Sequence, residues 1–107
     1  METSKAWVPV CSQSSLAEGE VIRFDRHDKT FCVYHTRSGF YASAGFCTHD
    51  QVHLAEGLVT NEEIECPMHQ GIFDVRTGKA LAAPACVDLK TYPVKIEQGQ
   101  VYIQIDA

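Results

Sequence analysis

Apolar and polar residues alternate along much of the chain, and this pattern predicts short β-strands. An apolar residue at every second position is typical of a strand with one buried face. The segments that alternate, or that are rich in β-branched and aromatic residues, are 7–11, 21–26, 30–36, 40–44, 91–97 and 100–106. No segment keeps helical spacing, and residues 14–19 have room for one helical turn only, with Ser14 or Ser15 as its cap. We therefore expect an all-β fold.

Four of these segments pair into two predicted hairpins. Residues 30–44 turn at 37–39, which is Arg-Ser-Gly, and residues 91–106 turn at Gln98-Gly99. Short connections that contain glycine favour antiparallel neighbours. Pro93 has no amide hydrogen to donate, so we expect its strand to lie at the edge of a sheet or to begin late.

The stretch from Gly45 to Pro84 interrupts this rhythm. Its strand pattern is weak, glycines and polar residues are frequent, and two Cys/His pairs fall within it. Loops held by a rigid sheet often carry binding residues, and a loop-rich segment of this length needs something to hold it together. We expect residues 1–107 to form a single domain, with a loop-built subdomain of about 45–84 around a metal centre.

The composition is that of an ordinary globular domain. Apolar residues make up 45% of the 107 residues, and charged residues make up 21%. The formal net charge of −5 argues against nucleic-acid binding, which needs a basic patch. An acidic surface suits a protein that is steered toward a basic patch on a partner.

No stretch of the sequence has the pattern of a secretion signal or of a membrane span. The five cysteines are an odd number, which does not fit a secreted disulfide framework. In a reducing compartment, cysteines serve as core residues, metal ligands or nucleophiles. These features predict a cytoplasmic protein that does not bind membranes.

The chemistry of the chain is concentrated in Cys47-Thr48-His49 and Cys66-Pro67-Met68-His69. Thiolates and imidazoles together suit zinc or iron. Structural zinc typically uses pairs separated by about two to four residues, which the second pair fits and the first does not. A Rieske [2Fe–2S] cluster needs two thiolates on one iron and two imidazoles on the other. One Cys and one His from each loop supply that set, so we expect Cys47, His49, Cys66 and His69 to bind one such cluster.

These two pairs, together with Gly71 and Phe73-Asp74, resemble the Rieske pattern C-x-H…C-P-x-H-x-G-x-F-D. The likeness continues through 77–80, Pro84 and 91–95 and covers nearly the whole chain. Among Rieske proteins, the chain most resembles the small ferredoxin components of aromatic-ring-hydroxylating dioxygenases, especially those of the naphthalene and biphenyl type. The resemblance implies the Rieske fold, with an antiparallel β-sandwich base and two ligand loops at one end. It also implies a third, proline-bearing loop near Pro84 that covers the cluster.

The resemblance also implies the function. Such a protein is a one-electron carrier between a flavin-containing NAD(P)H ferredoxin reductase and a terminal oxygenase with its own Rieske centre. The sequence shows no nucleophile–base pair and no nucleotide-binding glycine motif, so we expect a carrier and not an enzyme. We expect it to be a monomer. The alternatives are a Rieske-fold small subunit of a nitrite reductase-like complex and a zinc-stabilised binding module.

Two departures from other Rieske classes bear on the redox potential. Respiratory and photosynthetic Rieske proteins add a cysteine to each ligand loop, where this chain has Val52 and Met68, so we expect no disulfide there. The same proteins place hydroxyl groups near the cluster where this chain has Gly71 and Phe73. Because hydrogen bonds to sulfur stabilise the reduced cluster, we expect a potential toward the lower end of the roughly −150 to +300 mV Rieske range.

Other residues near the ligands have expected roles. Thr48 is expected to cap a loop amide, to donate toward the other ligand loop, or to be solvated. Gly57 and Gly71 are each expected either to permit a close approach of two backbones or to lie in an ordinary turn. His53 is not needed to complete the ligand set and is interpreted as a surface residue. Cys11 and Cys32 are interpreted as core strand residues, and Cys86 is expected near the proline loop. The docking surface is expected to consist of Asp50, Gln51, His53, Met68, Gln70 and Pro84.

Overall fold

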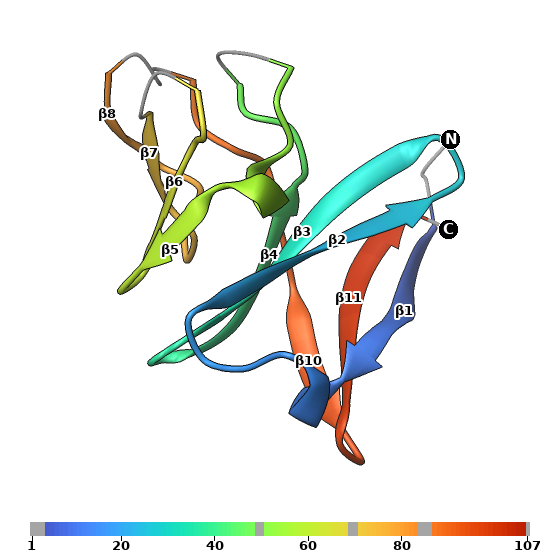
Figure 1. The fold of residues 1–107 in the computed structure, drawn as a ribbon. Coiled ribbons are helices and arrows are strands. Elements are labelled where there is room, and N and C mark those ends of the chain that lie inside the picture. The colour runs from blue at the N-terminus through green and yellow to red at the C-terminus, as the bar shows by residue number, and fades with distance from the viewer. Residues whose placement is uncertain (1–3, 49–50, 69–70, 84–86, 107) are drawn as a thin grey trace.

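The computed structural model describes residues 4–48, 51–68, 71–83 and 87–106, which form three antiparallel sheets (Figure 1). The first sheet has the order β1 (Lys5–Ser12), β11 (Gln100–Asp106) and β10 (Val94–Glu97). The second has the order β2 (Glu20–Arg26), β3 (Lys29–Thr36), β4 (Gly39–Ala44) and β9 (Thr91–Tyr92). The third has the order β5 (Leu58–Thr60), β6 (Glu63–Glu65), β7 (Ile72–Asp74) and β8 (Ala80–Ala82).

The helices of the described chain are two single 3-10 turns, η1 (Gln13–Ser15) and η2 (Leu54–Glu56). No helix in this part of the chain has the length and apolar character needed to cross a membrane. The prediction of an all-β fold is confirmed.

The first two sheets form the sandwich base. Their facing side chains make one buried core, to which β11 contributes Val101, Ile103 and Ile105 at every second position. This is the alternation expected of a strand with one buried face. Burying a side chain of this size stabilises the fold by about 1.5–3 kcal/mol. The base therefore follows directly from the pattern of apolar residues in the sequence.

Strand β3 belongs to two cores at once. Phe31 and Val33 pack into the core of the base, whereas Cys32 and Tyr34 pack into a second core that contains residues of the third sheet. Successive side chains of a strand point to opposite faces, so a strand between two cores is apolar at every position. The run Phe31–Tyr34 joins the base to the third sheet.

The predicted hairpin of β3 and β4 is present, and its turn is one residue shorter than expected, because Gly39 already pairs with Thr36. The segment 91–97 differs from the prediction, because it is divided at Pro93. Tyr92 pairs with Ala42 in the second sheet, and Val94 pairs with Ile103 in the first. Pro93 donates no ladder hydrogen bond, and the chain changes sheets at this residue. The late start expected for the strand is confirmed for β10, which forms the predicted hairpin with β11.

The predicted helical turn is shifted toward the N-terminus. It covers Gln13–Ser15, so Ser14 and Ser15 lie inside the turn and neither is its cap. The Ser15 hydroxyl donates instead to the Ser12 carbonyl oxygen at 2.8 Å. Because the Ser15 hydroxyl is engaged with this carbonyl oxygen, it does not cap the turn.

The segment 45–84, expected to be built from loops, contains the four strands of the third sheet. Each strand has three residues, which is too short for alternation to be visible in the sequence. The carboxylate of Glu62, in the turn between β5 and β6, accepts hydrogen bonds from Ser38 Oγ at 2.7 Å and Thr36 Oγ1 at 3.1 Å. These bonds lower the pKa of Glu62 and tie this turn to the end of β3.

Gly57 lies where two backbones meet, which is the first of the two alternatives expected for it. Its φ of −87° is open to any residue, so the requirement for glycine is one of space. A Cβ at this position would overlap the carbonyl oxygen of Glu65 and lie 3.2 Å from the carbonyl oxygen of Leu54. The close approach holds η2 against β6, immediately before Cys66.

Candidate metal centre

The two loops that carry the Cys/His pairs are built in the same way. In the first, the amide of Cys47 donates to the carbonyl oxygen of Val52 at 2.9 Å. In the second, the amide of Cys66 donates to the carbonyl oxygen of Gly71 at 2.7 Å. Each cysteine therefore begins a loop that closes at the same distance along the chain, 47 to 52 and 66 to 71.

A strand-like pair lies at the base of each loop. Phe46 and His53 form an isolated antiparallel bridge below the first loop. Glu65 of β6 and Ile72 of β7 pair below the second. Both loops thus leave and rejoin paired backbone, and paired backbone limits how far the cysteines move.

The structure brings the two predicted thiolate ligands into one buried cluster. Cys47 is 5% exposed and Cys66 is 1% exposed, and both belong to the core that also contains Leu54, Ile64 and Phe73. His49 and His69 lie outside the described residues. Among the residues that are described, no group of three or more His, Cys, Asp or Glu side chains is placed to hold a metal ion.

The donor set fits an iron–sulfur cluster. Two cysteines from separate loops are buried in one cluster of apolar side chains, which shields them from water. Burial alone disfavours a thiolate, and a bound metal ion reverses this preference because its charge removes the proton. The buried cysteines can therefore hold the sulfur-ligated half of a [2Fe–2S] cluster, with the histidine positions two and three residues further along their loops.

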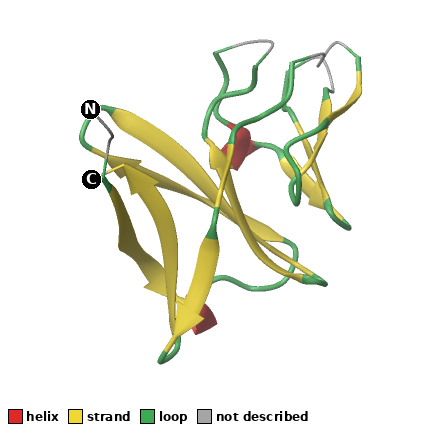
Figure 2. Cartoon of the chain, turned by 180° about the vertical axis from the view of Figure 1, so that it is seen from behind, coloured by secondary structure: helices red, strands yellow, loops and turns green. Residues whose placement is uncertain are grey.

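A third segment is attached to the first loop. Thr48 Oγ1 donates to the carbonyl oxygen of Val87 at 2.6 Å, so Thr48 is bonded to the segment that follows Pro84. The amide of Leu89 in turn donates to the carbonyl oxygen of Gly78 at 2.7 Å. The loops that follow β4, β6 and β8 extend toward the same end of the molecule (Figures 1 and 2). Thr48 is exposed, and its bond goes to this third segment and not to the second ligand loop.

His53 is buried, and the interpretation of this residue as a surface residue is wrong. Only 3% of it is exposed. Its Nδ1 accepts the amide hydrogen of Ala55 at 3.1 Å, and its Nε2 lies 2.7 Å from Thr30 Oγ1. Burial is the main cause that lowers its pKa. One feature of the sequence could have indicated this position. In His-Leu-Ala-Glu, the histidine precedes a short helical turn and can cap it by accepting a backbone amide hydrogen, as His53 does for η2.

Cys11 and Cys32 lie on strands and pack against the two cores, in agreement with their interpretation as core strand residues. Cys32 is fully buried, and burial raises the pKa of its thiol to about 12, so it is a neutral core residue and not a ligand candidate. Cys11 is half-buried against the core of the base. Cys86 lies outside the described residues.

The expected docking residues are placed only in part. Gln51 and Met68 are exposed, and Met68 shows 46% of its surface. His53 does not belong to this surface because it is buried. Two further apolar side chains near the ligand loops, Phe46 and Val87, are 44% and 59% exposed. Asp50, Gln70 and Pro84 lie outside the described residues.

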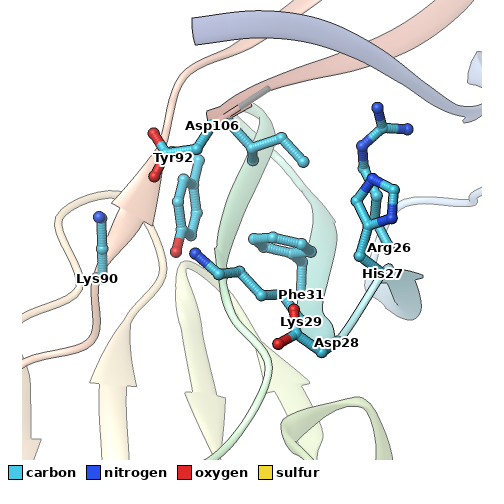
Figure 3. Close-up of a pocket in the computed structure, with 9 residues that line it drawn as sticks. Arg26, His27, Asp28, Lys29, Phe31, Lys90, Tyr92 and Asp106 are labelled. Carbon is cyan, nitrogen blue, oxygen red and sulfur yellow. The ribbon is translucent and has the colours of Figure 1, made fainter. Parts of the chain in front are cut away.

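A cavity of about 290 Å³ lies at a different place, between the β2–β3 turn and the ends of β9 and β11 (Figure 3). Its floor includes Phe31 and Tyr92, whose rings meet edge to face at 5.1 Å. Lys29 and Lys90 line its sides. None of its lining residues belongs to the buried cluster around Cys47 and Cys66, so this cavity is not the metal centre.

The fold and the paired Cys/His loops define a class of protein. The model of the Rieske [2Fe–2S] domain matches residues 6–93, and the chain therefore belongs to this family. The predicted cofactor, a Rieske-type [2Fe–2S] cluster, is confirmed by this assignment.

The relatives narrow the class to ferredoxin components. The chain is 41% identical to the ferredoxin component of the naphthalene 1,2-dioxygenase system of Pseudomonas putida, over 92% of this chain and 95% of the relative. It is 38% identical to the biphenyl 2,3-dioxygenase ferredoxin component of Rhodococcus jostii, over 94% of each chain. The predicted class, a ferredoxin component that carries electrons and is not the catalytic subunit, is confirmed.

Solved structures agree with this assignment. The complex of reduced oxygenase and oxidized ferredoxin in carbazole 1,9a-dioxygenase contains a chain that matches with a TM-score of 0.88 and 36% identity, over 91% of both chains. The Sphingomonas yanoikuyae B1 ferredoxin matches with a TM-score of 0.87 and 34% identity, over 95% of this chain and 99% of that chain. A nitrite reductase small subunit from Mycobacterium tuberculosis matches with a TM-score of 0.84 but 17% identity, which shows a shared fold alone.

Proposed function

We propose that Cys47, His49, Cys66 and His69 bind the [2Fe–2S] cluster of this ferredoxin. The observation that carries the proposal is the pair of buried cysteines at equivalent positions of two loops with the same closing hydrogen bond. The cluster-binding unit would comprise about residues 45–84 of a single domain of 1–107. The cluster, when bound, supplies a site that gains and releases one electron.

The residues of the chain prepare this site in three ways. Cys47 and Cys66 supply thiolates to one iron inside an apolar core, which keeps water from the sulfur atoms. His49 and His69 supply neutral imidazoles to the other iron, and neutral ligands make the site easier to reduce than a four-cysteine site. Thr48 ties the first loop to the third segment and limits its movement when charge is added.

Serine or asparagine variants of the four residues test the ligand assignment. Cys47→Ser, Cys66→Ser, His49→Asn and His69→Asn are each expected to abolish the wild-type stoichiometry of iron and acid-labile sulfide. The matched controls are Cys11→Ser, at a half-buried cysteine, and His27→Asn, at an exposed histidine with the positive φ of 56° that asparagine tolerates. Full iron and sulfide in any one of the four ligand variants would overturn the assignment.

We further propose that the protein accepts an electron from a flavin-containing NAD(P)H ferredoxin reductase and passes it to a terminal Rieske oxygenase. The naphthalene and biphenyl relatives are ferredoxin components of dioxygenase systems, and the carbazole ferredoxin forms a complex with its oxygenase. The net charge of −5 suits transient docking on basic patches. The protein would act as a monomer in the cytoplasm, where a reducing compartment suits the free thiols of Cys11 and Cys32.

A reconstituted system tests the role. With a reductase and an oxygenase of the naphthalene type, oxygen-dependent turnover is expected to require this protein and to fall as ionic strength rises. Turnover that is the same without the protein would refute the role. Turnover that requires the protein but does not respond to salt would refute electrostatic steering alone.

A further inference from the structure

His53 occupies a position that its sequence context did not predict, at the return of the first ligand loop. Both ring nitrogens are used. Nδ1 accepts the amide hydrogen of Ala55 at 3.1 Å, so Nε2 carries the ring proton and donates to Thr30 Oγ1 at 2.7 Å. Thr30 lies on β3, so this bond joins the loop to the base.

The hydrogen bonds continue from Thr30 to the surface. The Thr30 hydroxyl donates to the carboxylate of Asp25 on β2, and Arg23 Nε donates to the same carboxylate at 3.0 Å. The bond from Thr30 is the largest of the causes that lower the pKa of Asp25. Every group in the series His53, Thr30 and Asp25 thus has a defined donor or acceptor role, which fixes the direction of each bond.

The surroundings leave the His53 ring little freedom. A Cβ on Gly45 would lie 2.6 Å from His53 Nε2 and 2.9 Å from Thr30 Cγ2, so only glycine leaves room for the ring and its partner. The ring of Phe46 meets the His53 ring at 71° with 5.5 Å between centroids. Phe46 directly precedes Cys47, so the ring is packed against the start of the ligand loop.

We propose that His53 is a positioning residue that fixes the first ligand loop, and with it Cys47, against β2 and β3 through its bond to Thr30. This inference rests on the proposed function in so far as Cys47 is a cluster ligand. The loop is also closed by the bonds from Cys47 to Val52 and from the Leu54 amide to the Gly45 carbonyl oxygen at 2.8 Å. These two amide hydrogens report on whether the loop is held.

Four variants separate the two bonds of the ring. Thr30→Val removes the acceptor of Nε2 and keeps the shape of the side chain. His53→Asn keeps an acceptor near the position of Nδ1 and removes the bond to Thr30. The double variant Thr30→Val/His53→Asn tests whether the two side chains act together, and His27→Asn is the control at an exposed histidine.

The first measurement is amide hydrogen exchange on the purified holoprotein. Each single variant is expected to speed exchange at Cys47 and Leu54 about fivefold, which corresponds to the loss of one hydrogen bond. The double variant is expected to add nothing beyond His53→Asn, and exchange in β11 is expected to stay at the wild-type rate. Wild-type exchange at Cys47 and Leu54 in both single variants, or fully additive effects, would overturn the proposal.

The second measurement is the midpoint potential at full iron content. A loosened loop admits water near the sulfur atoms, and a more polar environment stabilises the reduced, more negative cluster. The potentials of Thr30→Val and His53→Asn are therefore expected to rise, and that of His27→Asn is expected to stay unchanged. Faster exchange with an unchanged potential would leave His53 a structural role only and overturn the proposal.

The failure of the proposed function is distinguishable from the failure of this inference. A wild-type protein that binds no iron would refute the ligand assignment. In that protein, exchange at Cys47 and Leu54 alone decides whether His53 positions the loop.

Discussion

Replacing Gly57 by alanine is expected to separate η2 from β6 and to disturb the second ligand loop. The φ of −87° at this position is ordinary for alanine, so the backbone conformation itself costs nothing. The added Cβ would overlap the carbonyl oxygen of Glu65, which is backbone and cannot move away by rotating a side chain. Glu65 directly precedes Cys66, so relief of the overlap displaces the second of the two proposed thiolate ligands.

The size of the effect follows from the kind of contact. Overpacking costs typically about 1–3 kcal/mol, and a clash with backbone belongs at the upper end, about 3 kcal/mol. Gly99→Ala is the matched control, because Gly99 has a φ of 75° and nothing within 4 Å of a Cβ. Gly99→Ala therefore costs only the strain of placing alanine in the left-handed region of φ, about 1 kcal/mol. For a chain of this size these values correspond to falls in Tm of about 12–24 °C and about 4–8 °C.

Thermal unfolding of the two holoproteins, followed by circular dichroism and by the visible absorption of the cluster, measures the difference. Gly57→Ala is expected to lose its visible absorption at a lower temperature than Gly99→Ala and to release iron faster to a chelator. If Gly57→Ala melted at or above the temperature of Gly99→Ala, the close approach between η2 and β6 would not exist as described.

Three further predictions concern the environment of the site. Phe73 is fully buried in the core that also contains Cys47 and Cys66, so Phe73→Tyr places a hydroxyl group there. An added hydrogen bond to sulfur should raise the midpoint potential, and an unchanged or lower potential in a redox titration would contradict this. Thr48→Val removes the bond to Val87 and should speed iron release a few-fold, as a chelator assay measures, with Thr60→Val as the exposed control. The pKa of Glu62 is lowered below its usual 4.5, so its hydrogen bonds stabilise the fold fully above that value and progressively less as pH falls below it toward the folded pKa. Glu62→Gln should therefore weaken the fall in Tm between about pH 5 and 3, and an identical fall in both proteins would refute the prediction.

Much of the base could be predicted because its information is local. The alternation in β11 specifies its buried face, and the apolar run Phe31–Tyr34 specifies a strand buried on both sides. The ligand pattern of Cys47 and Cys66 is also local, since each pair lies within one loop. The short strands of the third sheet have too few residues to show a period, so tertiary pairing decides them.

The misinterpreted residues depend on partners that are distant in sequence. His53 is buried because Thr30 and Gly45 provide an acceptor and a space for its ring. The local sequence indicates only that residue 53 caps a helical turn, and neither of these two partners is near it in sequence. The division of the strand at Pro93 depends likewise on the two sheets that its halves join. Composition and spacing report what a residue can do, whereas the fold decides which partner it meets.

The central claim, that this chain carries one electron on a mixed cysteine and histidine cluster, is tested most directly by metal and sulfide analysis with EPR. The sample is the anaerobically purified protein, reduced with dithionite. About two iron and two acid-labile sulfide per chain, with the low average g-value of a mixed Cys/His cluster, are predicted. One zinc per chain, no sulfide and no EPR signal would contradict the account.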